Sequence, residues 1–240
     1  MTENEAVLSR AAREPDEQLR YGDDADQVID YYQAKNPRPL VIYLHGGFWR
    51  PKYDRTHARP LCAALADLGW PVASVEYRRV PGEPDATTSD VQAALDTLPN
   101  LLDLQAGYVL VGHSAGGQLA LWAAATLNPV RLRGVVALAP VADLLLADQL
   151  TLGAGAVQAF IGSGVRNDLD PVHLQAPIAS VTLLHGLTDT VVPLQLSESY
   201  YTAHPTARLT PVPAAGHYEL IDPESDAFHT LTAELTRLTT

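Results

Sequence analysis

The chain has 240 residues, of which 47% are hydrophobic and 18% charged, and its formal net charge is −12. This length and apolar content exclude a disordered chain and predict one large domain with a sizeable core. The acidic balance, with no local cluster of Lys and Arg, argues against binding to nucleic acid or to an anionic membrane. Cys62 is the only cysteine, which excludes an internal disulfide. Because Met1–Arg10 lacks the basic and apolar segments of a signal peptide, we expect a cytoplasmic protein.

In the first half of the chain, strand and helix patterns alternate. Residues 1–20 are polar with a weakly helical spacing, and we expect a surface helix or partly ordered arm ahead of a single domain over residues 21–240. The elements predicted next are strands Val28–Tyr32 and Leu40–Leu44, a helix His57–Leu68 closed by Gly69, a strand Val72–Tyr77, and a helix capped by Thr88, Ser89 or Asp90 that runs to Leu98.

The second half continues the alternation. Its short apolar runs lack polar residues at every second position, which is typical of strands covered on both faces. We therefore predict an α/β fold with a mainly parallel sheet, helices on both faces, and ligands at the carboxyl ends of the strands. Residues 142–177 contain no strand pattern and are expected to form a short lid-like insertion over those ends. The elements are strands Tyr108–Val111, Val135–Leu138, Val181–Leu184 and Leu209–Val212, and helices Gln118–Leu127, Leu194–Ala203 and Pro223–Leu238.

One motif organises the chain: Gly112-His113-Ser114-Ala115-Gly116 stands between a strand pattern and a helix pattern. This Gly-x-Ser-x-Gly context is the one in which a serine forms a nucleophile elbow. A serine on so tight a turn takes a strained backbone conformation, and the flanking glycines relieve the crowding. The alternative is a Gly/Ser turn that only connects two elements.

Two further residues follow strand patterns and complete a catalytic set with Ser114. Asp189 lies in the loop after Val181–Leu184, and His217 follows the run that ends at Val212. The order Ser, Asp, His is that of hydrolases with a nucleophile elbow. A serine hydroxyl needs a base with a pKa near neutrality, and the base needs a carboxylate to hold its tautomer. Taken singly, Asp189 would be a turn residue and His217 a surface histidine. Together with Ser114 they predict a triad.

A second glycine motif, His45-Gly46-Gly47-Phe48-Trp49, directly follows the strand Leu40–Leu44. Acyl transfer develops negative charge on a carbonyl oxygen, which requires fixed N–H donors. We expect one donor from the N–H of Ala115 and another from Gly47 or Phe48, because a Gly-Gly turn lets the backbone approach closely. We expect His45 to brace this loop rather than to act as acid or base.

Other residue types are less specific. Trp49, Tyr53 and Phe160 are candidates for lining an aromatic substrate pocket, although aromatic residues near a core more often only pack. The histidines show no metal-ligand spacing, and no Gly-rich phosphate loop follows a strand, so we predict no metal and no cofactor. Arg50, Arg78 and Arg79 can bind a substrate carboxylate or pair with Glu76 or Asp54, and the sequence favours the ion pairs.

The four motifs around His45, Ser114, Asp189 and His217 together resemble the α/β-hydrolase superfamily, and the His-Gly-Gly-x-Trp loop is similar to that of its esterase and kynurenine formamidase (arylformamidase) branch. The resemblance spans about Tyr21 to the C-terminus. It implies Ser114 as nucleophile, Asp189 and His217 as its partners, and Gly47, Phe48 and Ala115 as oxyanion donors.

The motifs lead to the hypothesis of a metal-independent serine hydrolase acting on a small-molecule ester or activated amide. The resemblance adds an arylformamidase-like preference for a small acyl group on an aromatic leaving group. An exopeptidase of the same superfamily and a non-catalytic small-molecule receptor on the same fold remain as alternatives. The sequence predicts no oligomeric state.

Overall fold

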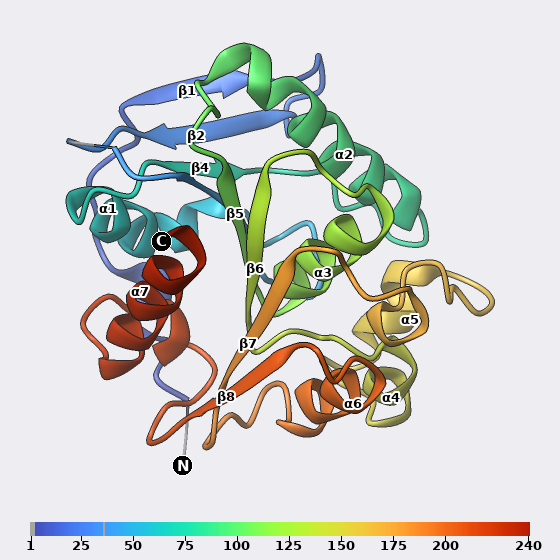
Figure 1. The fold of residues 1–240 in the computed structure, drawn as a ribbon. Coiled ribbons are helices and arrows are strands. Elements are labelled where there is room, and N and C mark those ends of the chain that lie inside the picture. Colours follow the sequence, from blue (N-terminus) through green and yellow to red (C-terminus); the bar gives the residue numbers. More distant parts are fainter. Residues whose placement is uncertain (1–2, 36) are drawn as a thin grey trace.

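The computed structural model describes residues 3–35 and 37–240, and an eight-stranded sheet runs through its centre (Figure 1). The strands lie in the order β1-β2-β4-β3-β5-β6-β7-β8. β1 and β2 pair antiparallel at one edge, β2 is antiparallel to β4, and all the other neighbours are parallel. The predicted mainly parallel α/β fold is therefore confirmed. The strands are β1 Glu17–Arg20, β2 Val28–Tyr32, β3 Leu40–Leu44, β4 Val72–Val75, β5 Tyr108–His113, β6 Leu132–Leu138, β7 Ser180–Gly186 and β8 Arg208–Val212.

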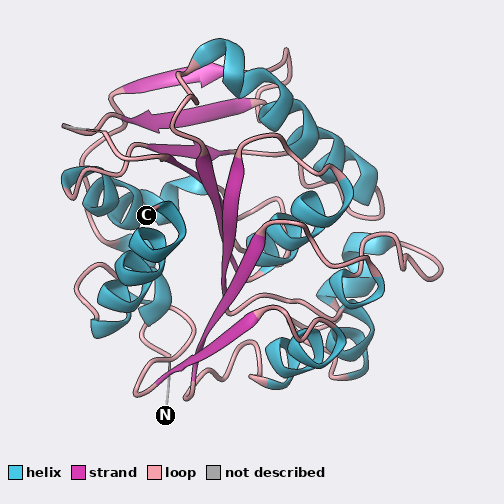
Figure 2. Ribbon diagram, in the orientation of Figure 1, coloured by secondary structure: helices cyan, strands magenta, loops and turns pink. Residues whose placement is uncertain are grey.

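Helices cover both faces of this sheet (Figure 2). α1 and α7 pack on one face and α2 to α6 on the other, as Figure 1 shows. The α-helices are α1 Arg59–Asp67, α2 Pro84–Leu101, α3 Ala115–Thr126, α4 Leu144–Gln149, α5 Ala156–Ile161, α6 Gln195–Ala203 and α7 Asp226–Thr239. The shorter 3₁₀ helices are η1 Glu5–Ser9, η2 Arg55–Ala58, η3 Pro171–His173 and η4 Glu219–Ile221.

The double cover explains the unbroken apolar runs of the strands. Successive side chains of a strand point to opposite faces, and in β3 the residues Leu40, Ile42 and Leu44 join the core beneath α2 and α3. Val41 and Tyr43 join the second core, beneath α1 and α7. Both faces of the strand are buried, so both sets of side chains are apolar.

Several predicted elements differ in extent from the observed ones, and three of the differences have a clear structural reason. β1 was expected to belong to a surface helix or arm, but its polar residues form an exposed edge strand that is held by pairing with β2. α2 begins at Pro84, well ahead of the predicted caps at Thr88, Ser89 or Asp90. A proline is well suited to the first turn of a helix, where its missing N–H has no partner to lose. α7 begins at Asp226 instead of Pro223, with Ser225 in the N-cap position.

The insertion over residues 142–177 forms α4, α5 and η3 and contains no strand. It is docked on neighbouring loops: the Gly82 N–H donates to the Ala159 carbonyl at 2.8 Å, and Gly153 lies against the Phe48 ring. The insertion thus reaches the loop that follows β3. Whether it moves as a lid stays a prediction.

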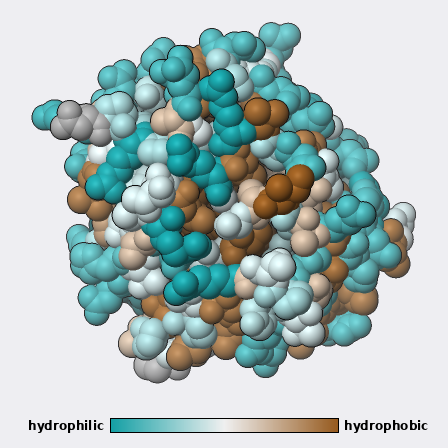
Figure 3. Space-filling view, in the orientation of Figure 1, coloured by the Kyte–Doolittle hydropathy of each residue, from teal (hydrophilic) through white to brown (hydrophobic). Residues whose placement is uncertain are grey.

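The face of the molecule shown in Figure 3 is mostly hydrophilic, with hydrophobic residues scattered between polar ones. Within residues 3–35 and 37–240, no helix has both the length and the apolar character needed to cross a membrane.

Candidate active site

Ser114 lies on the sharp turn between β5 and α3, with φ at 56° and ψ at −118°. This left-handed conformation is strained for a residue with a side chain and is typical of functional sites. The flanking glycines make it possible: a Cβ on Gly112 would lie 2.1 Å from the Gly116 carbonyl oxygen, and one on Gly116 would lie 2.1 Å from the Leu44 carbonyl oxygen. The elbow therefore packs directly on the end of β3.

His217 and Asp189 form a hydrogen-bonded pair beside Ser114. The Nδ1 atom of His217 lies 2.7 Å from Oδ2 of Asp189, and both side chains are buried. The other oxygen of Asp189 accepts the backbone N–H groups of Val191 and Val192, each at 2.8 Å. These bonds hold the carboxylate in one orientation, with Oδ2 toward the imidazole.

The loops after β7 and β8 meet because a glycine stands between them. A Cβ on Gly186, the last residue of β7, would lie 2.3 Å from the Ala215 carbonyl oxygen. The Thr188 N–H also donates to that carbonyl, at 2.9 Å. The chain can therefore cross the end of β7 closely enough to bring His217 to Asp189.

The loop after β3 lies against the elbow and contains backbone N–H groups that have no partner among the described residues. Gly47, Phe48 and Trp49 have φ values of 114°, 52° and 53°, a run of left-handed conformations. Among the described residues, no hydrogen-bond acceptor is found for the backbone N–H of Gly47, Phe48 or Ala115. Most N–H groups in a folded protein are paired, so unpaired donors beside a serine suit an oxyanion site.

A buried polar cluster supports this loop from behind. The His45 Nε2 atom lies 3.0 Å from Oε1 of Glu76, and its Nδ1 atom lies 2.7 Å from the Gly46 carbonyl oxygen. The Tyr77 hydroxyl donates to the His45 carbonyl at 2.6 Å, and its ring stacks on the imidazole. Burial lowers the pKa of His45 to about 3, so this ring is neutral at physiological pH. These contacts fit a bracing role for His45.

The candidate residues surround a cavity of about 310 Å³. Both Ser114 and His217 line it, although no hydrogen bond joins their side chains in the described part of the chain. Catalytic hydrogen bonds are often long in unliganded sites and tighten when substrate binds. The remaining lining residues are Leu8, Gly47, Phe48, Arg50, Tyr53, His57, His113, Gly153, Val191 and Tyr218.

Of the three aromatic residues suggested for the pocket, only Tyr53 lines this cavity. Trp49 and Phe160 instead stack on each other in the core, with ring centroids 4.4 Å apart, and each is 3% exposed. The Trp49 Nε1–H donates to Gln118, whose amide donates in turn to the Leu169 carbonyl at 2.8 Å. Trp49 and Phe160 are therefore packed in the core against the insertion and do not line the cavity. The sequence did not single out Gln118.

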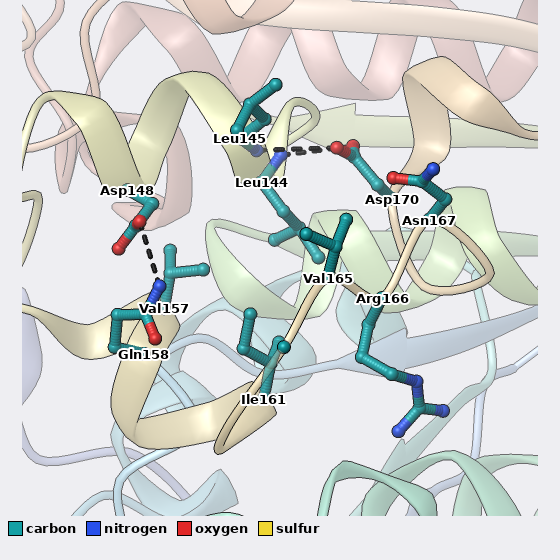
Figure 4. A pocket seen from close by; sticks show the side chains of 11 residues that line it. Leu144, Leu145, Asp148, Val157, Gln158, Ile161, Val165, Arg166, Asn167 and Asp170 are labelled. Carbon is teal, nitrogen blue, oxygen red and sulfur yellow. Dashed lines mark hydrogen bonds between the residues drawn. The ribbon is translucent and has the colours of Figure 1, made fainter.

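A smaller cavity of about 90 Å³ lies within the insertion (Figure 4). Its walls include the apolar side chains of Leu144, Ile161 and Val165, while Asp170 turns to accept the Leu144 N–H at 3.0 Å. Neither Ser114 nor a histidine reaches it. The candidate catalytic residues Ser114 and His217 line the larger cavity instead. In residues 3–35 and 37–240, no cluster of potential metal ligands was found.

The N-terminal segment also reaches the site, which the sequence did not predict. Oε1 of Glu3 accepts the Thr190 N–H at 2.6 Å, and Oε2 accepts the His217 N–H at 2.8 Å. Val7 is buried in the core beneath α1, and Leu8 lines the cavity. No local signal in the sequence marks Glu3, because its partners lie about two hundred residues further along the chain.

The model of a family described as "alpha/beta hydrolase fold" matches residues 41–192, more than half of the chain. The chain belongs to this family. The α/β-hydrolase resemblance seen in the sequence is thereby confirmed, and by family membership the chain is a hydrolase.

Curated relatives of this α/β-hydrolase include a kynurenine formamidase of Danio rerio, which is 24% identical over 91% of this chain and 80% of the relative. Esterase LipC of Mycobacterium tuberculosis is 30% identical over 45% of this chain and 29% of the relative. Among solved structures, esterase B from Lactobacillus rhamnosis superposes with a TM-score of 0.76 at 21% identity, covering 98% of this chain and 89% of that one. At this identity the superposition shows the shared fold.

Buried histidines make the stability of the α/β-hydrolase depend on pH. Burial lowers the pKa of His45 to about 3 and that of His113 well below its usual value, and it also lowers the pKa of His185. Below about pH 6.5 these histidines bind protons in the unfolded chain but stay neutral in the folded chain. The free energy of unfolding therefore falls as the pH falls. Each of the three contributes up to about 1.4 kcal/mol per pH unit.

Urea unfolding at pH 7.5, 6.5 and 5.5, at constant ionic strength, measures this effect. We expect the extrapolated free energy of unfolding to decrease at each step. A value at pH 5.5 equal to or above that at pH 7.5 would contradict the prediction.

Proposed function

We propose that this α/β-hydrolase is a serine hydrolase that cleaves carboxylic esters or activated amides through an acyl-enzyme. The observation that carries the proposal is that Ser114 and His217 line one cavity. Asp189 forms a 2.7 Å hydrogen bond with Nδ1 of the His217 imidazole. No other cavity described above brings a strained serine next to a histidine.

In the proposed reaction, His217 Nε2 takes the proton of Ser114 as its oxygen attacks the substrate carbonyl. Asp189 keeps the proton of the imidazole on Nδ1 and stabilises the imidazolium that forms. The N–H groups of Ala115 and of Gly47 or Phe48 bind the developing oxyanion. His217 then donates that proton to the leaving group. In the second half of the reaction, His217 takes a proton from the water that attacks the acyl-enzyme and returns it to Ser114, which releases the acid.

The substrate class we favour is a small acyl group on an aromatic leaving group, as in an arylformamide or aryl ester. The proposal is supported by the kynurenine formamidase among the relatives and by the aromatic side chains of Phe48, Tyr53 and Tyr218 around the cavity. A volume of about 310 Å³ is suited to a substrate of one ring rather than to a long acyl chain.

Two measurements test the proposal. A fluorophosphonate probe should add covalently to Ser114, as read by peptide mass spectrometry. Purified protein should hydrolyse 4-nitrophenyl acetate and, for arylformamidase-like specificity, N-formylkynurenine. Turnover of the ester but not of the formamide would leave a general carboxylesterase. If neither an adduct nor turnover is found, a non-catalytic receptor is favoured. If only peptide amides are cleaved, an exopeptidase is favoured.

A further inference from the structure

Arg50 is the one charged side chain among the described residues that line the catalytic cavity. It directly follows the loop of unpaired N–H groups and is half-buried. Its guanidinium donates to the Gly153 carbonyl oxygen in the insertion. That bond uses one of five N–H donors and leaves the positive charge uncompensated, because a carbonyl carries no net charge.

The neighbouring arginines behave differently. Arg78 pairs with Asp90 at 2.7 Å, Arg79 pairs with Glu76, and Arg55 pairs with Asp30 at 2.9 Å. No carboxylate in residues 3–35 and 37–240 lies within ion-pair distance of Arg50. The ion pair that the sequence favoured for Arg50 is therefore not formed, whereas Arg78 and Arg79 are both occupied.

Acidic side chains are also missing from the described wall of the cavity. Burial, together with nearby Glu5, Tyr53, Glu3 and Asp189, raises the pKa of Tyr218 to about 12, so three carboxylates lie in the neighbourhood. None of them lines the cavity, and the oxygens of Glu3 and Asp189 already accept hydrogen bonds. A protein with a net charge of −12 repels anions overall, so an anionic substrate would need a local cation.

We propose that Arg50 binds a carboxylate of the substrate, which makes anionic esters or amides the preferred substrates of the site. This inference rests on the proposed function. The planar guanidinium matches the geometry of a carboxylate and can bind it through two parallel hydrogen bonds. Ordinary neutral esters would then be turned over without using this contact.

The test compares 3-acetoxybenzoate with its neutral isostere 3-acetoxybenzamide. We expect the wild-type ratio of kcat/KM to favour the carboxylate by about tenfold or more, the value of a charged hydrogen bond in a partly exposed site. Arg50→Gln should lower that ratio about tenfold, and Arg50→Lys, which keeps the charge but loses the planar fork, should lower it less.

A ratio near one in the wild-type enzyme, or an unchanged ratio in Arg50→Gln, would overturn the proposal while leaving the esterase function intact. A binding measurement makes the test independent of turnover. Calorimetry on Ser114→Ala should give about tenfold weaker binding of 3-acetoxybenzoate once Arg50→Gln is added. Equal affinity would reject the role of Arg50, whereas failure of the proposed function would appear as missing turnover and labelling.

A second, independent observation concerns Glu3. Its carboxylate bridges the loops of the acid and the base: Oε1 accepts the N–H and the hydroxyl of Thr190, next to Asp189, and Oε2 accepts the N–H of His217. We infer that Glu3 is a positioning residue that holds these two loops together from the N-terminal segment. This inference also rests on the proposed function.

Glu3→Gln tests the bridge, because an amide nitrogen cannot accept a hydrogen bond and one of the two loops must lose its partner. With 4-nitrophenyl acetate we expect kcat to fall about three- to tenfold, the range for the loss of an ordinary hydrogen bond, and KM to stay the same. The rate of fluorophosphonate labelling should fall in parallel. Glu5→Gln, on the same segment, is the matched control because Glu5 makes no described hydrogen bond.

A merely structural role would lower the melting temperature but not the kcat of the folded enzyme. Wild-type kcat in Glu3→Gln, or an equal loss in Glu5→Gln, would overturn the inference. Labelling of Ser114 in the wild-type enzyme separates this outcome from a failure of the proposed function.

Discussion

Ser114→Ala is expected to lower kcat for ester hydrolysis by about four to six orders of magnitude and to abolish covalent labelling by a fluorophosphonate. Ser114 carries the only hydroxyl at the elbow, and no other nucleophilic side chain among the described residues around the cavity lies at such a strained turn. The residual rate comes from binding and the oxyanion donors alone.

This experiment needs a folding control, because position 114 has a left-handed backbone that is strained for alanine as it is for serine. Circular dichroism and the melting temperature should match those of the wild-type protein. Ser89→Ala, at an exposed position on α2, serves as the matched control and should keep full activity. Wild-type turnover in Ser114→Ala would refute the proposed mechanism.

Asp189→Asn is expected to lower kcat by about four orders of magnitude with little change in fold. The reason lies in the fixed orientation of the side chain. One oxygen accepts the N–H groups of Val191 and Val192, so the amide oxygen of an asparagine must stay there. The amide nitrogen then faces Nδ1 of His217 and donates to it. A His217 imidazole that accepts this hydrogen bond at Nδ1 carries its own proton on Nε2, and it cannot accept a proton there from Ser114.

Steady-state kinetics on a 4-nitrophenyl ester measures this loss. Asp103→Asn, an exposed turn residue remote from the site, controls for the substitution itself. A loss of less than about tenfold would mean that Asp189 does not hold the tautomer of the base.

Much of the site can be read from the sequence because each part of it is local. Ser114 is marked by glycines two positions away on both sides, and the loop with the proposed oxyanion donors by two glycines that follow a strand and His45. These glycines are required by close backbone approaches within a few residues or between neighbouring strands, such as Gly116 against Leu44. The elements are equally local where apolar runs are long, as in β3 and β5.

Elements held mainly by tertiary pairing were missed. β1 has a polar sequence with no strand pattern and forms only because β2 offers an unpaired edge. The fate of Trp49 was also not readable, since its aromatic character suits a pocket and a core equally well. Stacking on Phe160 from a distant segment placed it in the core.

The sequence by itself determined the fold class, the order of the three candidate catalytic residues and the elbow that carries Ser114, because short-range sterics and strand patterning encode them. Tertiary structure decided which cations are neutralised and which loops are tied together. Arg50 is without a carboxylate in the described structure, whereas Arg78 and Arg79 are paired. Glu3 meets His217 across more than two hundred residues. Such contacts depend on how loops from different strands converge at the end of the sheet, and no local pattern records that convergence.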